Sequence, residues 1–196
     1  MIKKILSGFL GVVCVIGLQA QAANPTVVME TNKGAVVIEL YPDKAPITVE
    51  NFLGYVKDGF YDGTIFHRVI GNFMIQGGGH TEEFYQDTNK EKTTRAAIKN
   101  ESDNGLSNLP GTIAMARTSD PHSATSQFFI SVKDNSYLDG QPGVEGRPGR
   151  PGYTVFGKVI EGMDVVMSIS KIETRKLGLV ADVPIEPIVI KKVTVK

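Results

Sequence analysis

Cysteine is almost absent from this sequence, since Cys14 is the only one in 196 residues. It lies in an N-terminal segment that we expect to be removed, and it follows Val13, where a bacterial lipoprotein signal has a small residue. The sequence therefore predicts no lipid anchor. A mature chain without thiols forms no disulfide bond and cannot use thiol catalysis, and it can enter an oxidising compartment without cross-linking.

Histidine is also scarce, and the usual signatures of metal, cofactor and nucleophile sites are missing. The three histidines show no metal-ligand spacing: His67, His80 and His122. Asp120, His122 and Ser126 crowd into one short segment, and Ser126 lacks a nucleophile-elbow context, so we do not expect a catalytic triad. The glycine run at 77–79 is not followed by the Gly-Lys-Ser/Thr of a phosphate-binding loop. We predict no cofactor and no metal.

The sequence has no excess charge and one long apolar run. Its 21 basic and 21 acidic residues balance, which argues against a broad affinity for nucleic acid. The apolar run at 5–18 follows a short basic start and precedes Ala20-Gln21-Ala22, a small-x-small cleavage pattern. It is shorter than the roughly 20 residues of a membrane span. We predict a signal peptide at residues 1–22, with cleavage after Ala23 as the alternative, no stable membrane insertion, and a periplasmic or secreted protein.

Residues 23–196 suit one globular domain, because 41% of the chain is hydrophobic and 21% is charged. Alternating β-branched segments predict about eight short strands, at 27–31, 35–40, 66–70, 73–76, 111–116, 126–132, 154–160 and, with Lys191-Lys192 as a bulge, 187–195. Apolar spacing predicts a helix between Pro46 and Gly59, and a short second helix is expected at about 163–169. This pattern predicts a mainly antiparallel barrel capped by helices, but the strand count alone does not separate a barrel from a sandwich.

The segment 66–79 is the most informative in the chain. It combines two short apolar strands with an arginine, a primary amide, a thioether and a glycine run. Regular alternation places Phe66, Arg68 and Ile70 on one face. It also places Met74 and Gln76 on one face of the second strand, and residues 73 and 75 together on the opposite face. A lone arginine here would lie on the surface, whereas this combination predicts an apolar cleft with one strong, fixed donor.

These residues resemble the signature of the cyclophilins, which are peptidyl-prolyl cis-trans isomerases. The resemblance runs from about Val27 to the C-terminus and rests on separated motifs: Phe66-His67-Arg68-Val69-Ile70, Phe73-Met74-Ile75-Gln76-Gly77-Gly78, Met115-Ala116, Ser126-Gln127-Phe128-Phe129 and Phe156-Gly157-Lys158. It implies an eight-stranded antiparallel barrel with a helix over each end. It also implies that Xaa-Pro segments of unfolded or partly folded proteins are the partners.

The resemblance also assigns roles to individual residues. It makes Arg68 the catalytic residue, able to donate to the prolyl nitrogen of the twisted peptide bond. It places Phe73, Met74, Phe129 and Leu138 around the proline ring, and Gln76, Gln127 and the main chain near Ala116 and Arg117 on the substrate backbone. If each apolar residue is considered by itself, it would be interpreted as part of the core. Only the joint pattern of these residues favours a pocket.

Three positions depart from many eukaryotic cyclophilins. Tyr137 stands where they have a tryptophan that contacts cyclosporin, Tyr153 where they have a histidine, and Arg117 where they have an asparagine. These changes resemble the bacterial secreted branch of the family. We therefore expect weak cyclosporin binding, with Tyr137 and Tyr153 still at the substrate site.

The alternative function is a non-catalytic proline-peptide binding module or a holdase chaperone that uses the same cleft. We expect a monomer that assists the folding of exported proteins.

One segment is not explained by the resemblance. Glycine recurs at every third position from Gly140 to Gly152, with prolines between, in a collagen-like register too short for a stable triple helix. A loop partly in polyproline II is the simplest interpretation. A contact of Arg147 or Arg150 with substrate, or competition by one of the loop's own Xaa-Pro bonds for the pocket, is the sharper hypothesis.

Overall fold

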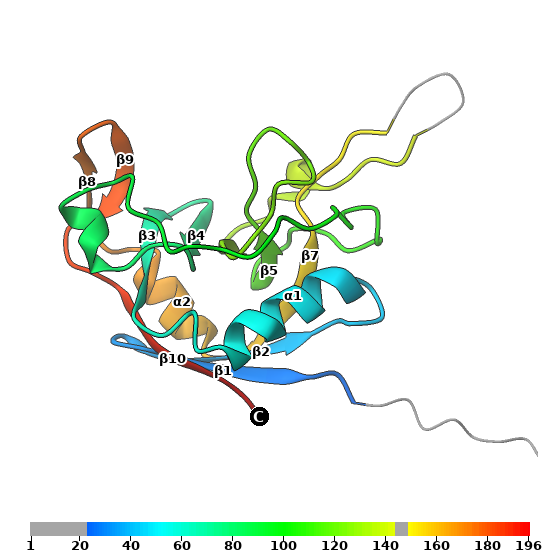
Figure 1. Cartoon of the computed structure of the whole chain (residues 1–196), viewed down its shortest axis with the longest axis horizontal. Helices are drawn as coiled ribbons and strands as arrows, with labels where there is room; N and C mark the ends of the chain where they lie inside the picture. Colours follow the sequence, from blue (N-terminus) through cyan, green and yellow to red (C-terminus); the bar gives the residue numbers. More distant parts are fainter. Residues whose placement is uncertain (1–22, 144–148) are drawn as a thin grey trace, which may run out of the picture.

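The computed structural model describes residues 23–143 and 149–196 (Figure 1). The predicted signal peptide, residues 1–22, and Arg147 in the glycine-rich segment lie outside these described residues. None of the described helices is long and apolar enough to cross a membrane.

Eight strands close into an antiparallel barrel, which confirms the predicted fold class. They run in the order β1-β10-β3-β4-β6-β5-β7-β2 around the barrel. Their bounds are β1 Thr26–Thr31, β2 Gly34–Leu40, β3 Thr64–Ile70, β4 Met74–Gly77, β5 Thr112–Met115, β6 Phe128–Ser131, β7 Val155–Glu161 and β10 Val189–Val195. The predicted bulge near the C-terminus is present, since Glu30 pairs with Lys192 while Thr31 pairs with Ile190, which leaves Lys191 as the extra residue.

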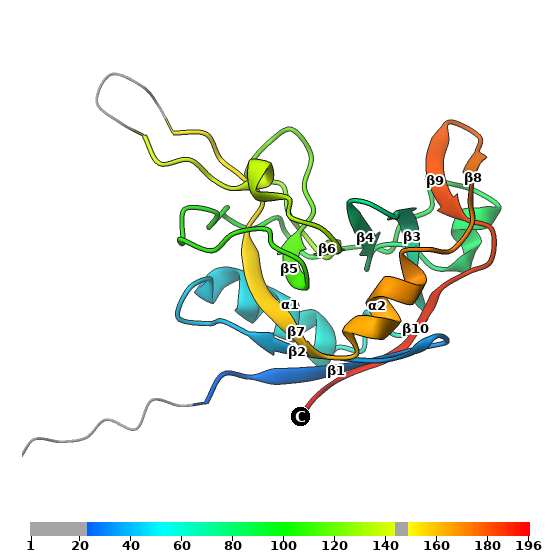
Figure 2. The ribbon, with the colours of Figure 1, turned by 180° about the vertical axis from the view of Figure 1, so that it is seen from behind.

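Two helices pack against the barrel, as predicted (Figure 2). Helix α1, Pro46–Lys57, has proline in its first turn, where the missing N–H costs no hydrogen bond. Its main-chain donors at Ile47 and Thr48 are instead satisfied by the carboxylate of Glu101, at 3.1 and 2.9 Å. Gly59, with φ +65°, follows its end. Helix α2, Met163–Ile169, buries Val166 and Ile169.

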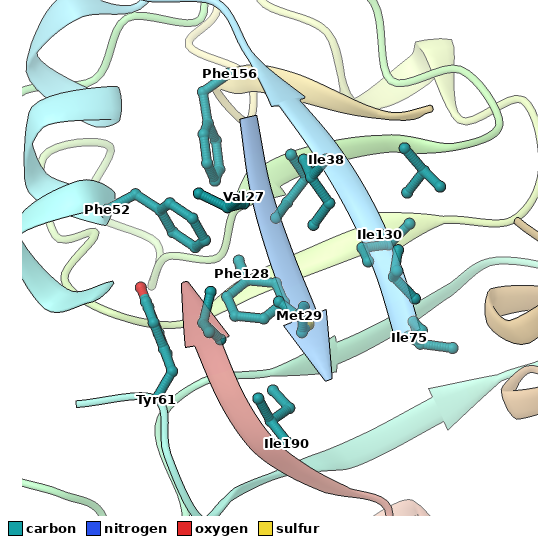
Figure 3. Packing of buried hydrophobic residues seen from close by; sticks show 14 of the residues in the cluster. Val27, Met29, Ile38, Phe52, Tyr61, Ile75, Phe128, Ile130, Phe156 and Ile190 are labelled. Atoms are coloured by element: carbon teal, nitrogen blue, oxygen red, sulfur yellow. The ribbon is translucent and has the colours of Figure 1, made fainter. Parts of the chain in front are cut away.

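Aromatic and branched side chains fill the barrel interior (Figure 3). The ring of Phe52 on α1 lies 5.2 Å from that of Phe156 on β7 and 5.1 Å from that of Tyr61. Phe128 on β6 meets Tyr61 edge-on at 5.6 Å. Because this packed core occupies the interior, a binding site must lie on the outer surface of the barrel.

Alternation along the strands produces a second apolar cluster on that outer surface. Phe128 and Ile130 of β6 belong to the interior, whereas Phe129 between them joins Met74, Ala114 and Val155 in the second cluster. Successive side chains of a strand point to opposite faces, so the same strands supply both clusters.

Regular alternation does not hold in β3, and the predicted common face of Phe66 and Arg68 is wrong. Phe66 pairs with Gly77 and Arg68 with the next residue, Gln76, so His67 is the extra residue of a β-bulge. The bulge reverses the alternation, because Phe66 packs in the interior core while Arg68 lines an outer cavity. The predicted shared face of residues 73 and 75 is also wrong. Phe73 precedes β4 and packs in the outer cluster, whereas Ile75 is interior.

Three elements were not predicted from the sequence. Two are short 3-10 helices, η1 at Glu82–Tyr85 and η2 at Ser136–Leu138. The third is a hairpin of β8, Thr174–Leu177, and β9, Val180–Pro184, which forms its own two-stranded sheet beside β3. Figures 1 and 2 show this hairpin projecting from the barrel, well separated from the ends of the glycine-rich segment.

Candidate active site

A cavity of about 200 Å³ opens on the outer surface over strands β3 to β6. It is lined by Arg68, Phe73, Met74, Gln76, Ala116, Arg117, Phe129, Leu138 and Tyr153. Sites for drug-sized ligands measure about 300–1,000 Å³, so this cavity is of the size for one side chain. The structure thus brings together every predicted site residue except Gln127 and Tyr137, which lie next to the cavity.

The walls of this cavity are apolar because they belong to the outer cluster. Met74 and Phe129 are buried on neighbouring strands β4 and β6. The ring of Tyr153 meets Phe129 edge-on at 5.6 Å. Leu138 comes from η2, and Phe73 from the turn before β4. A ring that enters the cavity is therefore surrounded by apolar surface on several sides.

Arg68 supplies a cation at this cavity, and its ionic partner is a carboxylate on the Nε side of the guanidinium. Its side chain is 41% exposed, and within the described residues its guanidinium makes no side-chain hydrogen bond. Its nearest charged partner is Asp182, with 4.0 Å between Arg68 Nε and Asp182 Oδ2. The guanidinium donors thus remain available to a substrate.

Gln76 and Gln127 form a chain of amides that ends on a carboxylate. Gln76 Nε2 donates to Gln127 Oε1 at 2.9 Å, and Gln127 Nε2 donates to Glu91 Oε1 at 2.6 Å. Gln127 does not line the first cavity but a second one of about 370 Å³, which shares Gln76, Ala116 and Arg117 with the first. An extended peptide can therefore run from one cavity into the other. Glu91 is a polar residue of this site that was not predicted.

Arg117 forms a wall of the site through fixed contacts. Its guanidinium donates to the main-chain carbonyls of Thr118, Pro151 and Gly152, at 2.8, 3.1 and 3.1 Å. It also lies over the ring of Tyr153, with Arg117 Cζ 4.5 Å from the ring centroid. Since these contacts engage three of its five N–H donors, Arg117 positions Tyr153 and is less available to substrate than Arg68.

Tyr137 lies at the rim, outside the cavity lining. Tyr137 is 61% exposed, and its ring stacks on Phe73 with 6.2 Å between centroids and 23° between planes. Arg150 Nη2 donates to the carbonyl oxygen of Tyr137 at 3.0 Å. The predicted place of Tyr137 beside the pocket is thus observed, as an outer neighbour of Phe73.

The described ends of the glycine-rich segment pair with each other. Gln141 and Arg150 form an antiparallel bridge. Gly152 packs so closely on Gly140 that an added Cβ would lie 2.2 Å from Gly140 N. Gln141, Pro142, Arg150 and Pro151 line a separate surface cavity with Asn100 and Ser102, and none of them lines the cavity at Arg68. Among the described residues, no Xaa-Pro bond of the segment occupies that cavity.

His67, the extra residue of the β3 bulge, is buried next to Arg68. Its ring lies 4.5 Å from that of His80, and its Nδ1 has no hydrogen-bond partner. Burial, His80 and then Arg68 lower the pKa of His67 from 6.5 to about 3. The imidazole is therefore neutral at physiological pH and adds no charge to the site.

The other chemistries considered from the sequence receive no geometric support. Ser126 Oγ is buried without a hydrogen-bond partner, so it is not activated by His122, whose Nδ1 accepts from the Asn100 N–H at 3.1 Å. Within residues 23–143 and 149–196, no group of three His, Cys, Asp or Glu side chains could hold a metal ion.

The comparisons with known proteins agree with this geometry. The family model "Cyclophilin type peptidyl-prolyl cis-trans isomerase/CLD" matches residues 26–195. This chain is a cyclophilin-type peptidyl-prolyl cis-trans isomerase. It is 54% identical over 174 residues to the peptidyl-prolyl cis-trans isomerase of Acinetobacter baylyi, covering 89% of this chain and 87% of that protein. It is 51% identical over 170 residues to peptidyl-prolyl cis-trans isomerase B of Escherichia coli, covering 86% and 98%.

Solved structures show the same cyclophilin fold. The crystal structure of a cyclophilin type peptidyl-prolyl cis-trans isomerase from Cryptosporidium parvum matches with a TM-score of 0.72 at 27% identity, over 88% of this chain and 98% of that one. The same protein in the presence of the dipeptide Ala-Pro matches with a TM-score of 0.69 at 26% identity, over 87% and 98%.

Proposed function

We propose that this cyclophilin isomerises Xaa-Pro bonds in unfolded or partly folded proteins, with the proline ring in the cavity beside Arg68. The observation that carries the proposal is the pairing of an apolar cavity for one side chain with a guanidinium that has free donors. The Ala-Pro dipeptide of the Cryptosporidium parvum structure supports a proline-containing ligand.

Isomerisation needs no nucleophile and no metal, because no bond is made or broken. The barrier is the loss of amide resonance, about 18–20 kcal/mol, and the uncatalysed step takes tens to hundreds of seconds. In the twisted transition state the prolyl nitrogen becomes pyramidal and gains a lone pair. Arg68 donates to that lone pair, which is absent from the planar ground state, so the contact favours the transition state selectively.

Arg68 alone does not account for the rate. Raising a rate from about 0.01 per second to about 10–1,000 per second requires lowering the barrier by roughly 4–7 kcal/mol. One charge-assisted hydrogen bond contributes about 1.5–3 kcal/mol. The remainder comes from the apolar walls of Phe73, Met74, Phe129 and Leu138, which hold the ring, and from Gln76 and Gln127, which hold the preceding peptide group.

A direct assay tests this proposal and separates it from the binding-module or holdase alternative. Exchange between the cis and trans forms of a short Xaa-Pro peptide is measured by NMR with catalytic amounts of the protein. We expect exchange to accelerate at least about a hundredfold over the free peptide. Binding of the peptide without faster exchange would contradict the proposal and support the alternative.

The cellular context we propose is the folding of exported proteins by a monomer of the bacterial secreted branch. It is supported by the basic start, apolar run and small-x-small pattern of residues 1–22. We expect the chain from its native cells in the periplasm or outside the cell, beginning at Ala23 or, with the alternative cleavage, at Asn24. N-terminal sequencing of the fractionated protein tests this, and a cytoplasmic chain that retains Lys3 and Lys4 would contradict it.

A further inference from the structure

The guanidinium of Arg68 faces a carboxylate that belongs to a distant part of the chain. Asp182 Oδ2 lies 4.0 Å from Arg68 Nε, and the two side chains are 40% and 41% exposed. This separation is longer than a hydrogen bond, which measures about 2.7–3.2 Å for N–H···O. The pair is therefore a charge contact on the Nε side of the guanidinium, and the donors on both Nη atoms stay free.

A β-bulge on each side places these two residues together. In β3 the extra residue is His67, directly before Arg68. In the hairpin, Arg175 pairs with Val183 and Leu177 with Val180. Lys176 alone therefore stands opposite two residues, the second of which is Asp182. Bulges redirect side chains and are frequent beside active sites. Here the two bulges turn the side chains of Arg68 and Asp182 toward each other.

The backbone at Asp182 is held in an uncommon conformation. Its φ is +62°, and it is the only non-glycine residue with positive φ in the described parts of the chain. Aspartate tolerates this left-handed region better than most side chains, but glycine would adopt it without steric cost. Strain of this kind persists where the surrounding structure enforces it, often at functional sites.

The hairpin base that carries Asp182 is firmly attached to the barrel. Val183, the next residue, is fully buried against Ile65 and Phe84. Tyr85 Oη donates to the carbonyl oxygen of Pro184 at 2.9 Å. Only the hairpin tip is free of the barrel, with Leu179 95% exposed. The carboxylate of Asp182 is thus presented from a rigid base.

We propose that Asp182 is a positioning residue that orients the guanidinium of Arg68 for catalysis. This inference rests on the proposed role of Arg68. Arginine has a planar, forked guanidinium on a flexible stem, and fixing its Nε side restricts the directions in which the Nη donors can point. A donor that is already oriented needs no reorganisation when the prolyl nitrogen becomes pyramidal. The carboxylate also reduces the net positive charge at the site, and this would lower turnover. Its removal therefore shows which effect is larger, the orientation of the guanidinium or the reduction of its charge.

The test compares Asp182→Asn with the unchanged protein in steady-state isomerisation of one Xaa-Pro peptide. Asparagine keeps the size of the side chain and tolerates positive φ. We expect kcat to fall about three- to tenfold, about 0.6–1.4 kcal/mol in activation free energy, with KM within about twofold. Asp182→Gly, which relieves the backbone strain, is expected to lose the same activity without losing thermal stability. A merely structural role would lower stability and activity together.

Two further variants make the result specific. Glu186→Gln removes a carboxylate that lies 4.0 Å from Lys33 Nζ instead of Arg68, and it should leave kcat unchanged. In an Arg68→Ala background, Asp182→Asn should have no further effect, because the residue through which it acts is gone.

The outcomes separate this inference from the proposed function. Unchanged or higher kcat in Asp182→Asn, with Arg68→Ala still impaired, overturns the positioning role alone. A higher KM at constant kcat means that Asp182 contacts the peptide, and this also overturns it. Full activity of Arg68→Ala would overturn the proposed role of Arg68 itself.

Discussion

Gln127 Nε2 donates to Glu91 Oε1 at 2.6 Å, while Gln127 Oε1 accepts from Gln76 Nε2 at 2.9 Å. The carboxylate thereby fixes which end of the Gln127 amide faces Gln76. One of the two N–H groups of the Gln76 amide is engaged in this way, and its carbonyl oxygen remains free as an acceptor. A peptide N–H of the substrate is the group that such an acceptor would bind.

Removing that carboxylate should weaken peptide binding more than turnover. In Glu91→Ala the Gln127 amide can rotate, so we expect KM to rise about two- to fivefold, about 0.4–1 kcal/mol, with kcat within about twofold. Steady-state kinetics on a short Xaa-Pro peptide measure both constants. Glu83→Ala is the matched control, since it removes a carboxylate that pairs with Lys90 at 3.5 Å and does not line either cavity. An equal KM in both variants would refute the role of Glu91.

Arg68 should determine turnover more than affinity. Arg68→Ala removes a contact made mainly in the transition state, so we expect kcat to fall at least about tenfold, about 1.4 kcal/mol, with peptide affinity within a few-fold. Calorimetric titration measures affinity, and NMR exchange measures turnover. Lys191→Ala, at the exposed bulge of β10, removes a cation away from the cavity and should retain full rate. A tenfold loss of affinity with unchanged turnover at saturation would show that Arg68 acts in the ground state.

Tyr137, which stands where many eukaryotic cyclophilins have tryptophan, should weaken cyclosporin binding. Tyrosine offers a smaller ring than tryptophan and places its donor differently from the indole N–H. We expect weak cyclosporin inhibition of this protein and at least about tenfold tighter inhibition of Tyr137→Trp, about 1.4 kcal/mol. Tyr137→Phe, which has the same ring without a donor, should stay as insensitive as the unchanged protein. If the unchanged protein binds the drug as tightly as the tryptophan variant, the assignment of Tyr137 is incorrect.

The strands could be predicted from the sequence because their signals are local, whereas the closed barrel and the cavity residues followed from the family resemblance. Alternation in 126–132 and the turn at Asn32-Lys33-Gly34 indicate strands and a hairpin from neighbouring residues alone. The bulge at His67 could not be predicted in this way, since the assumption of a strict two-residue period excludes it. It was the resemblance, and not the periodicity, that placed Phe73 and Arg68 at the same pocket.

Contacts between distant segments could not be predicted from the sequence. Glu91 lies in a polar loop with no periodic pattern, and only the folded chain brings it to Gln127. The hairpin that carries Asp182 has few buried side chains, with Val183 and Pro184 buried and Arg175 exposed, so its strands lack an alternating apolar face. The charge contact with Arg68 depends on two bulges that no local pattern indicates.

The buried His67 should make the protein less stable in mild acid. Its pKa is about 3 in the folded chain against 6.5 when unfolded, so between these values the unfolded chain binds one more proton. The free energy of unfolding is therefore independent of this group above about pH 6.5. It falls by up to about 1.4 kcal/mol per pH unit as the pH drops toward 3.

Replacing His67 by phenylalanine should remove this contribution, because phenylalanine does not titrate and is at least as easily buried. We expect the free energy of unfolding of His67→Phe, measured by urea denaturation between pH 7 and 4.5, to depend less steeply on pH, by about one proton. His122→Phe is the control, since His122 lies in an exposed loop and its removal should leave the steep dependence in place. Parallel stability curves for His67→Phe and the unchanged protein would mean that His67 does not lose a proton on folding. In that case the ring of His67 would stay charged in the folded protein, and its Nδ1–H would need an acceptor. Protonation of His67 would then not explain any sensitivity to acid.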